Sequence, residues 1–188
     1  MINNKIVILA VDSSKRNTGV AIVTHYKNDN DEDIFEVLSK VHIKIKPIPN
    51  EKVFQCELQS YNMMSFFIKD YISIIDYAVL EGYAFGGQGL TKLASTAAVF
   101  QLLFAMNNIP IIHIAPKRVK KIIADSGNAT KIEVRKGLEK FIKDYNTIVW
   151  PSYDVSDAAA IGIASAIVNL YPERFTTPPK KSRIKTNE

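Results

Sequence analysis

Hydrophobic residues follow two different spacings along the chain, and these spacings predict alternating strands and helices. Nearly unbroken β-branched runs at 5–11 and 18–24, separated by a polar turn, predict a hairpin of two buried strands. Apolar and polar residues alternate over 34–46, which is typical of a strand with one face in solvent. The chain is therefore expected to open with three strands.

A helical spacing replaces this pattern after residue 51. One apolar stripe predicts a long helix, and its members are Phe54, Leu58, Tyr61, Met64, Ile68, Tyr71, Ile72 and Ile75. Short apolar runs at 77–81 and 109–114 predict two further strands, the second an inner one, with a mostly buried helix at 90–106 between them. Strands that alternate with helices are typical of a parallel sheet.

The later helices differ in how much of their surface is apolar. The segment 117–124 turns its apolar residues inward and leaves four basic residues outside, namely Lys117, Arg118, Lys120 and Lys121. Thr130 and Glu133 form a capping-box pattern, which predicts the start of a helix with Val134, Leu138, Phe141 and Ile142 inward. The segment 154–170 is apolar on nearly every side, which predicts a helix packed against the sheet.

Length and composition limit the class of protein. The 188 residues have room for one globular domain, which we place at 1–171, followed by a basic tail at 172–188 that we expect to be loose. Lys and Arg number 24 against 19 Asp and Glu, and the net charge of +5 favours a polyanionic partner. The single cysteine, Cys56, cannot form an internal disulfide, which favours a reducing, cytoplasmic location. No apolar run approaches a signal-peptide core or a membrane span, so no membrane partner is expected.

Four acidic residues lie where predicted elements begin or end. Asp12 closes the first strand and Glu81 closes the strand after the long helix, while Asp154 and Asp157 share one face at the start of the last helix. The carboxyl ends of neighbouring parallel strands meet at one edge of a sheet, so the four side chains are expected to converge.

Converging carboxylates point to a metal site. Two carboxylates ~4 Å apart repel each other by about 4 kcal/mol at an effective dielectric constant of 20, so a crowded cluster needs protons or cations. An all-oxygen site favours Mg²⁺, with Mn²⁺ as a substitute. A pair of such ions is suited to the attack of water on a phosphodiester.

Each acid also has a simpler interpretation when it is taken alone. Asp154 can cap the last helix while Asp157 interacts with the helix dipole. Asp12 can be a turn residue, and Glu81 can be an exposed strand end. The metal site is favoured because all four acids occupy the same kind of position relative to elements that were predicted independently.

Three segments resemble the RuvC family of Holliday junction resolvases. Ile8–Gly19 is similar to the family's opening, in which an aspartate ends the first strand and Thr-Gly begins the second. Val79–Glu81 resembles its second acidic site, which is followed by an aromatic loop residue, and Asp154–Ile161 resembles its terminal Asp-x-x-Asp-Ala motif. Lys120 and Lys131 match the positions where the family has basic residues near the scissile phosphate.

The resemblance covers residues 5–170 and has two departures. Family members usually have Pro-Gly after the first aspartate, where this chain has Ser13 and Ser14. The basic tail has no counterpart in the family. It can add nonspecific DNA affinity through phosphate contacts, or it can be only a soluble end.

The resemblance implies an RNase H-like α/β fold, with a mixed five-stranded sheet flanked by helices. It also implies a metal-dependent endonuclease that resolves four-way DNA junctions by paired nicks, as a homodimer with two active sites. The four acids would hold two Mg²⁺ ions, and Lys120 or Lys131 would steady the transition state. The expected DNA-binding residues are Tyr83, Phe85, Lys117, Arg118, Lys120, Lys121 and Lys131.

Several alternatives stay open. The enzyme can be a less selective nuclease that acts on forks or flaps, or the chain can be a noncatalytic junction-binding protein. Phe85 can stack on an unpaired base or fold back to anchor its own loop. An actin-like kinase shares the Asp-turn-Gly opening but needs two such domains, for which the chain is too short. The three histidines have no matching ligand set and are expected to be structural: His25, His42 and His113.

Overall fold

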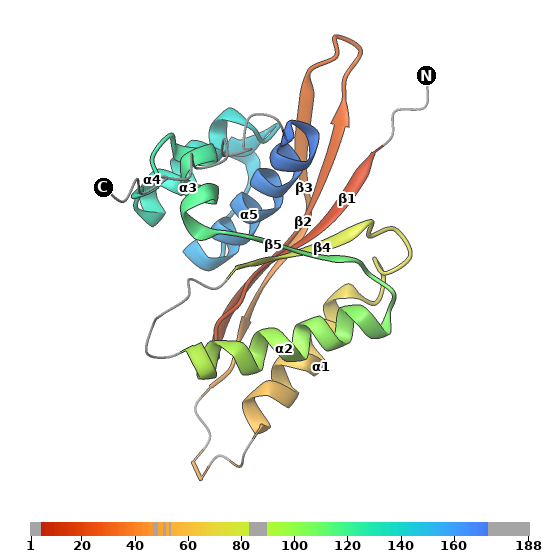
Figure 1. The fold of residues 1–188 in the computed structure, drawn as a ribbon, viewed down its shortest axis with the longest axis vertical. Helices are drawn as coiled ribbons and strands as arrows, with labels where there is room; N and C mark the ends of the chain where they lie inside the picture. The colour runs from red at the N-terminus through yellow and green to blue at the C-terminus, as the bar shows by residue number, and fades with distance from the viewer. Residues whose placement is uncertain (1–4, 47–48, 51, 53, 83–89, 173–188) are drawn as a thin grey trace, which may run out of the picture.

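A five-stranded mixed sheet runs through the centre of the molecule in the order β3-β2-β1-β4-β5 (Figure 1). The computed structural model describes residues 5–46, 49–50, 52, 54–82 and 90–172, without the side chains of 90–94. The first three strands are antiparallel neighbours, and the last two run parallel to the first, as the sequence predicts. The strands are β1 (Ile6–Asp12), β2 (Asn17–Lys27), β3 (Asp33–Lys44), β4 (Tyr77–Glu81) and β5 (Ile111–Ile114).

Helices cover both faces of this sheet. One face carries α1 (Gln55–Ile68) and α2 (Leu90–Met106) (Figure 1). The other face carries α3 (Pro116–Ala124), α4 (Lys131–Gly137) and α5 (Tyr153–Leu170). In the part of the chain that the structure describes, no helix combines the length and the hydrophobicity needed to cross a membrane.

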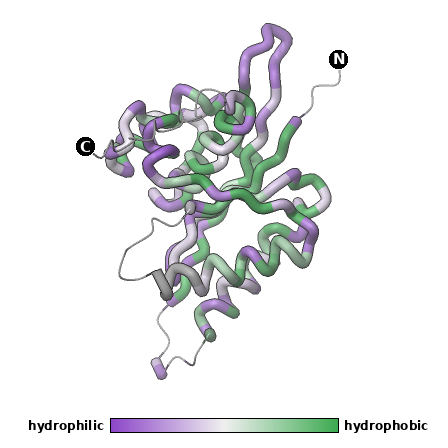
Figure 2. The backbone as a smooth tube through the Cα atoms, viewed as in Figure 1, coloured by the Kyte–Doolittle hydropathy of each residue, from purple (hydrophilic) through white to green (hydrophobic). Residues whose placement is uncertain are grey.

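The unbroken apolar run of β1 is explained by burial on both sides of the sheet. Val7, Leu9 and Val11 pack toward α1 and α2, whereas Ile8 and Ala10 pack toward α5. Hydrophobic residues accordingly concentrate in the central strands, while the tip of the β2–β3 hairpin is hydrophilic (Figure 2). Such double burial is what a parallel or central strand needs.

Helix α5 lies close against the sheet because its buried face is built from small residues. A Cβ on Gly162 would lie 3.0 Å from the Cβ of Ala10. The helix begins at the N-cap Ser152, whose Oγ accepts a hydrogen bond from the backbone N–H of Val155 at 3.3 Å. The interpretation of Asp154 as the cap is therefore wrong, and its carboxylate is left to interact outside the helix.

The predicted apolar stripe of the long helix is wrong at both ends. Phe54 and Leu58 are 65% and 59% exposed. The helix instead buries the carboxylate of Glu57, which accepts a hydrogen bond from Ser95 Oγ of α2 at 2.8 Å. It ends at Ile68 rather than Ile75, and turns follow it.

Two further predictions fail in detail. Strand β5 begins at Ile111 rather than at residue 109. It was predicted to be an inner strand but is an edge strand, because no sixth strand pairs with it among the described residues. His113 on this strand is exposed. The helix predicted to extend through Ile142 is shorter: α4 ends at Gly137, and a short 3-10 helix, Leu138–Lys140, follows it. The backbone of Gly137 lies close to α3, since a Cβ there would be 2.2 Å from the carbonyl oxygen of Ile123.

Candidate active site

The sheet brings Asp12 and Glu81 to the same edge of the molecule. β1 and β4 are parallel neighbours, and Val11 lies opposite Leu80. Asp12 and Glu81 are the residues that follow this pair, and each is the last residue of its strand. Both carboxylates therefore project from the carboxyl ends of inner strands, the usual place for a site in a sheet of this kind.

Gly19 allows the other two acids to reach this edge. It lies opposite Asp12 in β2, and a Cβ at this position would come 2.0 Å from the carbonyl oxygen of Asp154. Only a residue without a side chain permits so close an approach of β2 to the start of α5. The start of α5, with Asp154 in its first turn and Asp157 directly after that turn, is thus held beside Asp12.

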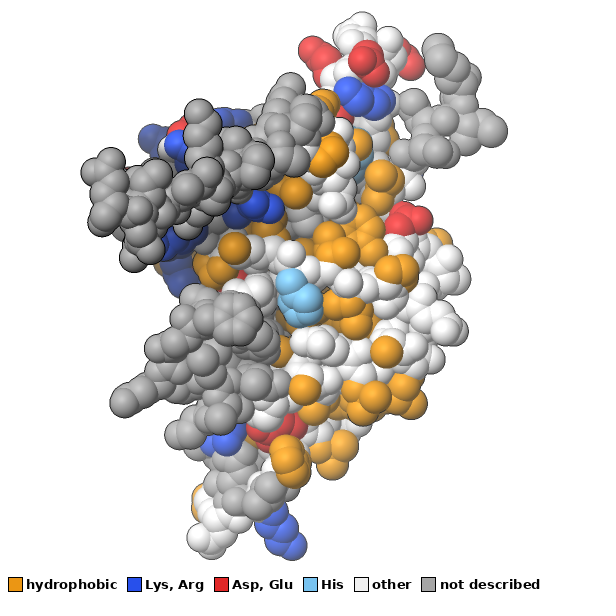
Figure 3. Space-filling view, in the orientation of Figure 1, with side chains coloured by type: hydrophobic (Ala, Val, Ile, Leu, Met, Phe, Trp, Pro, Cys, Tyr) orange, Lys and Arg blue, Asp and Glu red, His pale blue; other side chains and the backbone are white. Residues whose placement is uncertain are grey.

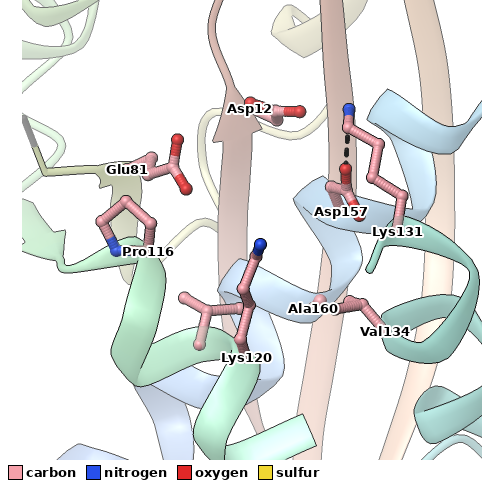
Figure 4. Close-up of a pocket in the computed structure, with 9 residues that line it drawn as sticks. Asp12, Glu81, Pro116, Lys120, Lys131, Val134, Asp157 and Ala160 are labelled. Atoms are coloured by element: carbon pink, nitrogen blue, oxygen red, sulfur yellow. Dashed lines mark ion pairs between the residues drawn. The ribbon is translucent and has the colours of Figure 1, made fainter. Parts of the chain in front are cut away.

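The predicted acids meet in one place. Single carboxylate oxygens of Asp12, Asp154 and Asp157 all lie within 4.8 Å of one another. Asp12 and Asp157 also line a cavity of about 260 Å³, with Glu81, Lys120 and Lys131 around it. Figure 4 shows these side chains directed toward the same hollow from β1, β4, α3, α4 and α5.

The acids that line the cavity have raised pKa values. Burial, followed by the charges of Glu81 and Asp157, raises the pKa of Asp12 to about 7. Burial and the charge of Asp157 likewise raise the pKa of Glu81. Burial also raises the pKa of Asp157, against the opposing effect of Lys131. Groups that resist ionisation in this way favour a cation among them.

Lys131 already lies between two of the acids. Its Nζ donates a hydrogen bond to Asp154 Oδ1 at 2.8 Å and lies 2.9 Å from Asp157 Oδ2. Burial acts to lower the pKa of Lys131, but its hydrogen bonds to the two acids outweigh this effect and raise it. Lys120, half-buried on α3, lowers the pKa of Glu81 from across the cavity.

The donor set is suited to a hard divalent cation. The group of Asp12, Asp154 and Asp157 offers carboxylate oxygens, and Glu81 lines the same cavity. Oxygen donors suit Mg²⁺ and Mn²⁺ and are less suited to metals that prefer sulfur or nitrogen. These residues therefore fit a metal centre of the kind that the sequence predicts.

Comparison with curated proteins connects the sequence to one kind of enzyme. No family model matches the chain. The crossover junction endodeoxyribonuclease RuvC of Chlamydia trachomatis is 27% identical over 86 residues, which are 46% of this chain and 51% of that protein. The RuvC of Porphyromonas gingivalis is 29% identical over 98 residues, 51% of this chain and 50% of that protein. The chain thus spans about half the length of the curated relatives it matches.

Comparison with solved structures extends the similarity to almost the whole chain. Thermus thermophilus RuvC superposes with a TM-score of 0.72 at 18% identity, covering 89% of this chain and 97% of that one. The chain has the RuvC fold. The same protein in complex with a Holliday junction substrate gives 0.71 at 18% identity, covering 87% and 94% of the two chains. The fowlpox virus resolvase, in complex with Holliday junction DNA, gives 0.52 at 14% identity, covering 88% and 99%.

The resemblance to RuvC and the RNase H-like fold are thereby confirmed. The mixed five-stranded sheet, its antiparallel opening and the terminal helix all agree with the prediction. The roles of the individual site residues are taken up below as proposals.

Two residues near the site of this RuvC fold were missed in the sequence. His42 of β3 has its Nε2 3.6 Å from Asp154 Oδ2, although it was expected to be only structural. Arg135 of α4 donates from Nε to Ser156 Oγ at 3.1 Å and thereby ties α4 to the first turn of α5. The signal for His42 is its register opposite Gly19, which requires knowing how β2 pairs with β3.

The predicted DNA-binding residues are only partly described. Lys117, Arg118 and Lys121 are exposed on α3, and Lys and Arg side chains gather on the side of the molecule where α3 and α4 lie (Figure 3). Tyr83 and Phe85 lie outside the described residues, as does most of the basic tail.

Proposed function

We propose that this chain is a RuvC-family resolvase, a metal-dependent endonuclease that cuts four-way DNA junctions by paired, symmetric nicks. The observation that carries the proposal is the convergence of acids and lysines at one place. Asp12, Glu81 and Asp157 line one cavity with Lys120 and Lys131. Asp154 lies beside Asp12 and Asp157. Similarity to curated RuvC proteins supports the reaction. Two structural neighbours in complex with Holliday junction DNA support the class of substrate.

We assign the four acids to two Mg²⁺ ions, for which Mn²⁺ would substitute. Bound in this way, the metal would lower the pKa of the attacking water and stabilise the charge on the leaving oxygen. The oxygen of water would attack phosphorus, the bond from phosphorus to the 3′ oxygen would break, and the 3′ oxygen would take up a proton. The four acids would hold the centre in place, since they belong to three packed elements, β1, β4 and α5.

The two lysines would act on the phosphate. Lys120 lines the cavity from α3 and presents a positive charge to it, so it is placed to stabilise the extra negative charge of the transition state. Lys131 lies on the other side of the cavity and has the same capacity once it is released from Asp154 and Asp157. Lys117, Arg118 and Lys121 would contact the DNA backbone beside the site.

The remaining parts of the proposal concern regions and assembly. Residues 1–171 would form the nuclease domain, with 172–188 as a basic tail. Tyr83 or Phe85 would stack on an unpaired base at the junction. Symmetric cutting needs two sites related by a twofold axis, so the active form would be a homodimer. A cytoplasmic location would agree with Cys56, a buried thiol with no second cysteine in the sequence for a disulfide.

The test is cleavage of a synthetic four-way junction by the purified chain with Mg²⁺ and with EDTA. We expect paired nicks at symmetric positions with Mg²⁺ and none with EDTA. A flap substrate cut equally fast would indicate the broader branched-DNA nuclease. Tight junction binding without turnover in Mg²⁺ or Mn²⁺ would indicate a noncatalytic binding protein, and absence of both binding and turnover would end the proposal.

A further inference from the structure

Lys131 occupies the position between acids where a cation is expected. Its ammonium contacts Asp154 Oδ1 at 2.8 Å and Asp157 Oδ2 at 2.9 Å. These two residues, with Asp12, form the group whose carboxylate oxygens lie within 4.8 Å of one another. Figure 4 shows the ammonium of Lys131 reaching from α4 to the carboxylate of Asp157.

An ammonium and a divalent cation cannot share these oxygens. Mg²⁺ binds carboxylate oxygens at about 2.0–2.1 Å, so an ion on Asp154 and Asp157 would lie within a few ångströms of the present position of Nζ. The two positive charges would repel each other strongly in a partly buried site. One of them has to leave when the other binds.

Lys131 can leave without a change in the backbone. Its side chain is 54% exposed, and it is the first residue of α4, directly after the N-cap Thr130. The four-carbon stem can therefore rotate into solvent. The helix itself stays in place because Arg135, one turn later, is bonded to Ser156 and lies over the ring of Tyr153, 3.9 Å from its centroid.

We propose that Lys131 is a built-in placeholder cation, which holds the acids together before metal binds and which metal binding releases toward the scissile phosphate. The inference rests on the proposed function and adds an order of steps to it: metal binds first, and Lys131 then becomes available to the phosphate. Before metal binds, the ion pairs of Lys131 with Asp154 and Asp157 keep these two carboxylates from binding metal and keep the lysine from binding DNA. After metal binds, the ligands hold the ion, and the lysine, still at the wall of the same cavity, is available for DNA.

The test measures metal binding by the full chain without DNA. Mn²⁺ affinity is determined by electron paramagnetic resonance for the native chain, Lys131→Met and Lys120→Met. Both variants remove one positive charge from the wall of the cavity. Of these two lysines, Lys131 is the one that forms ion pairs with the acids in the structure, so Lys120→Met serves as the control. We expect Lys131→Met to bind Mn²⁺ about tenfold more tightly, and Lys120→Met to change affinity by no more than about threefold.

A second readout follows the lysine directly. In the metal-free native chain, the Nζ protons of Lys131 should give a protected resonance in nitrogen-detected NMR, which should be lost when Mg²⁺ is added. Lys131→Gln serves as a second variant, and circular dichroism checks that each variant is folded. Lys131→Met should also cut DNA more slowly, so that metal affinity and turnover change in opposite directions.

The possible failures are distinguishable. Equal Mn²⁺ affinities for Lys131→Met and Lys120→Met, or a resonance that persists with Mg²⁺, would overturn the displacement of Lys131 while leaving Mg²⁺-dependent cleavage intact. Weaker binding by Lys131→Met would overturn it as well, since the lysine would then support the metal. A native chain that binds no Mn²⁺ would overturn the metal-dependent function itself.

Discussion

Asp12 lies at the end of β1 among other acids. Its pKa is raised to about 7 by burial and by the charges of Glu81 and Asp157. In the unfolded chain an aspartate ionises near pH 4, so between about pH 4 and 7 the folded chain holds a proton that the unfolded chain has lost. The stability that the protonated form of Asp12 gives the folded chain is fully present below the pKa of the unfolded chain, and it is lost as the pH rises through about 7.

Asp12→Asn is therefore expected to stabilise the metal-free protein and to inactivate it. At pH 8 the substitution removes a buried charge that its neighbours repel, and the free energy of unfolding should rise by on the order of 1–3 kcal/mol. At pH 5 the gain should shrink, because Asp12 is then protonated in the native chain. Urea unfolding at both values measures this. Junction binding should persist without cleavage, and full activity would refute the assignment of Asp12 to the metal.

Metal affinity should depend on pH for the same reason. A divalent ion has to displace the proton from Asp12, so Mn²⁺ affinity should rise by up to about tenfold per unit between pH 5 and 7 and level off above it. Calorimetric titration across this range measures the slope. Asp12→Asn should show a flatter profile, and an identical slope in the variant would place the titrating group elsewhere.

At the scale of elements, the site depends on how closely α5 approaches the sheet. Small residues such as Gly162 let the helix lie on β1 and β2, and Gly19 lets β2 pass the backbone of Asp154. Arg135 fixes α4 to α5, and so places Lys131 opposite the acids. The acids are positioned by close contacts between backbones as much as by their own side chains.

Gly19→Ala tests this close approach. The added Cβ would lie 2.0 Å from the Asp154 carbonyl oxygen, so the start of α5 has to shift. We expect a loss of stability of about 1–3 kcal/mol and weaker Mn²⁺ binding. Gly127→Ala is the matched control, because its Cβ would have an ordinary contact of 3.4 Å with Lys117. Equal effects of the two substitutions in thermal unfolding and Mn²⁺ titration would contradict the role given to Gly19.

At the scale of the whole molecule, the two faces of the sheet differ in what they leave exposed. The face with α3, α4 and α5 carries the site and the basic residues of α3. The face with α1 and α2 leaves large apolar side chains mostly exposed, including Leu58, Phe66, Leu102 and Met106. Exposed apolar residues on adjacent helices are typical of a surface that meets another protein, which supports the proposed homodimer.

Leu102→Glu tests whether α2 takes part in self-association. Leu102 is 59% exposed, and a charge there should shift the mass in solution from dimer to monomer, as measured by light scattering. Val149→Glu is the control, since Val149 is 81% exposed and precedes α5 on the other side of the sheet. The monomer should keep its Mn²⁺ affinity, because the acids all come from one chain. A native chain that is monomeric at all concentrations would contradict the homodimer.

The sequence by itself determined the elements whose signals are local. The capping box of Thr130 and Glu133 forms as predicted, because its partners are three residues apart. The unbroken apolar run of β1 identified a central strand. Asp12 and Glu81 end their strands and Asp154 lies in the first turn of its helix, as predicted. Periodicity and spacing are enough for such features, since they depend on neighbours along the chain.

Only the tertiary structure decided features that depend on distant segments. It made β5 an edge strand, turned Glu57 of α1 toward Ser95, and placed His42 beside Asp154. It also put the ammonium of Lys131 between two acids more than twenty residues away. Each of these outcomes depends on strand register and on how closely helices pack, which residue type and local spacing leave undetermined.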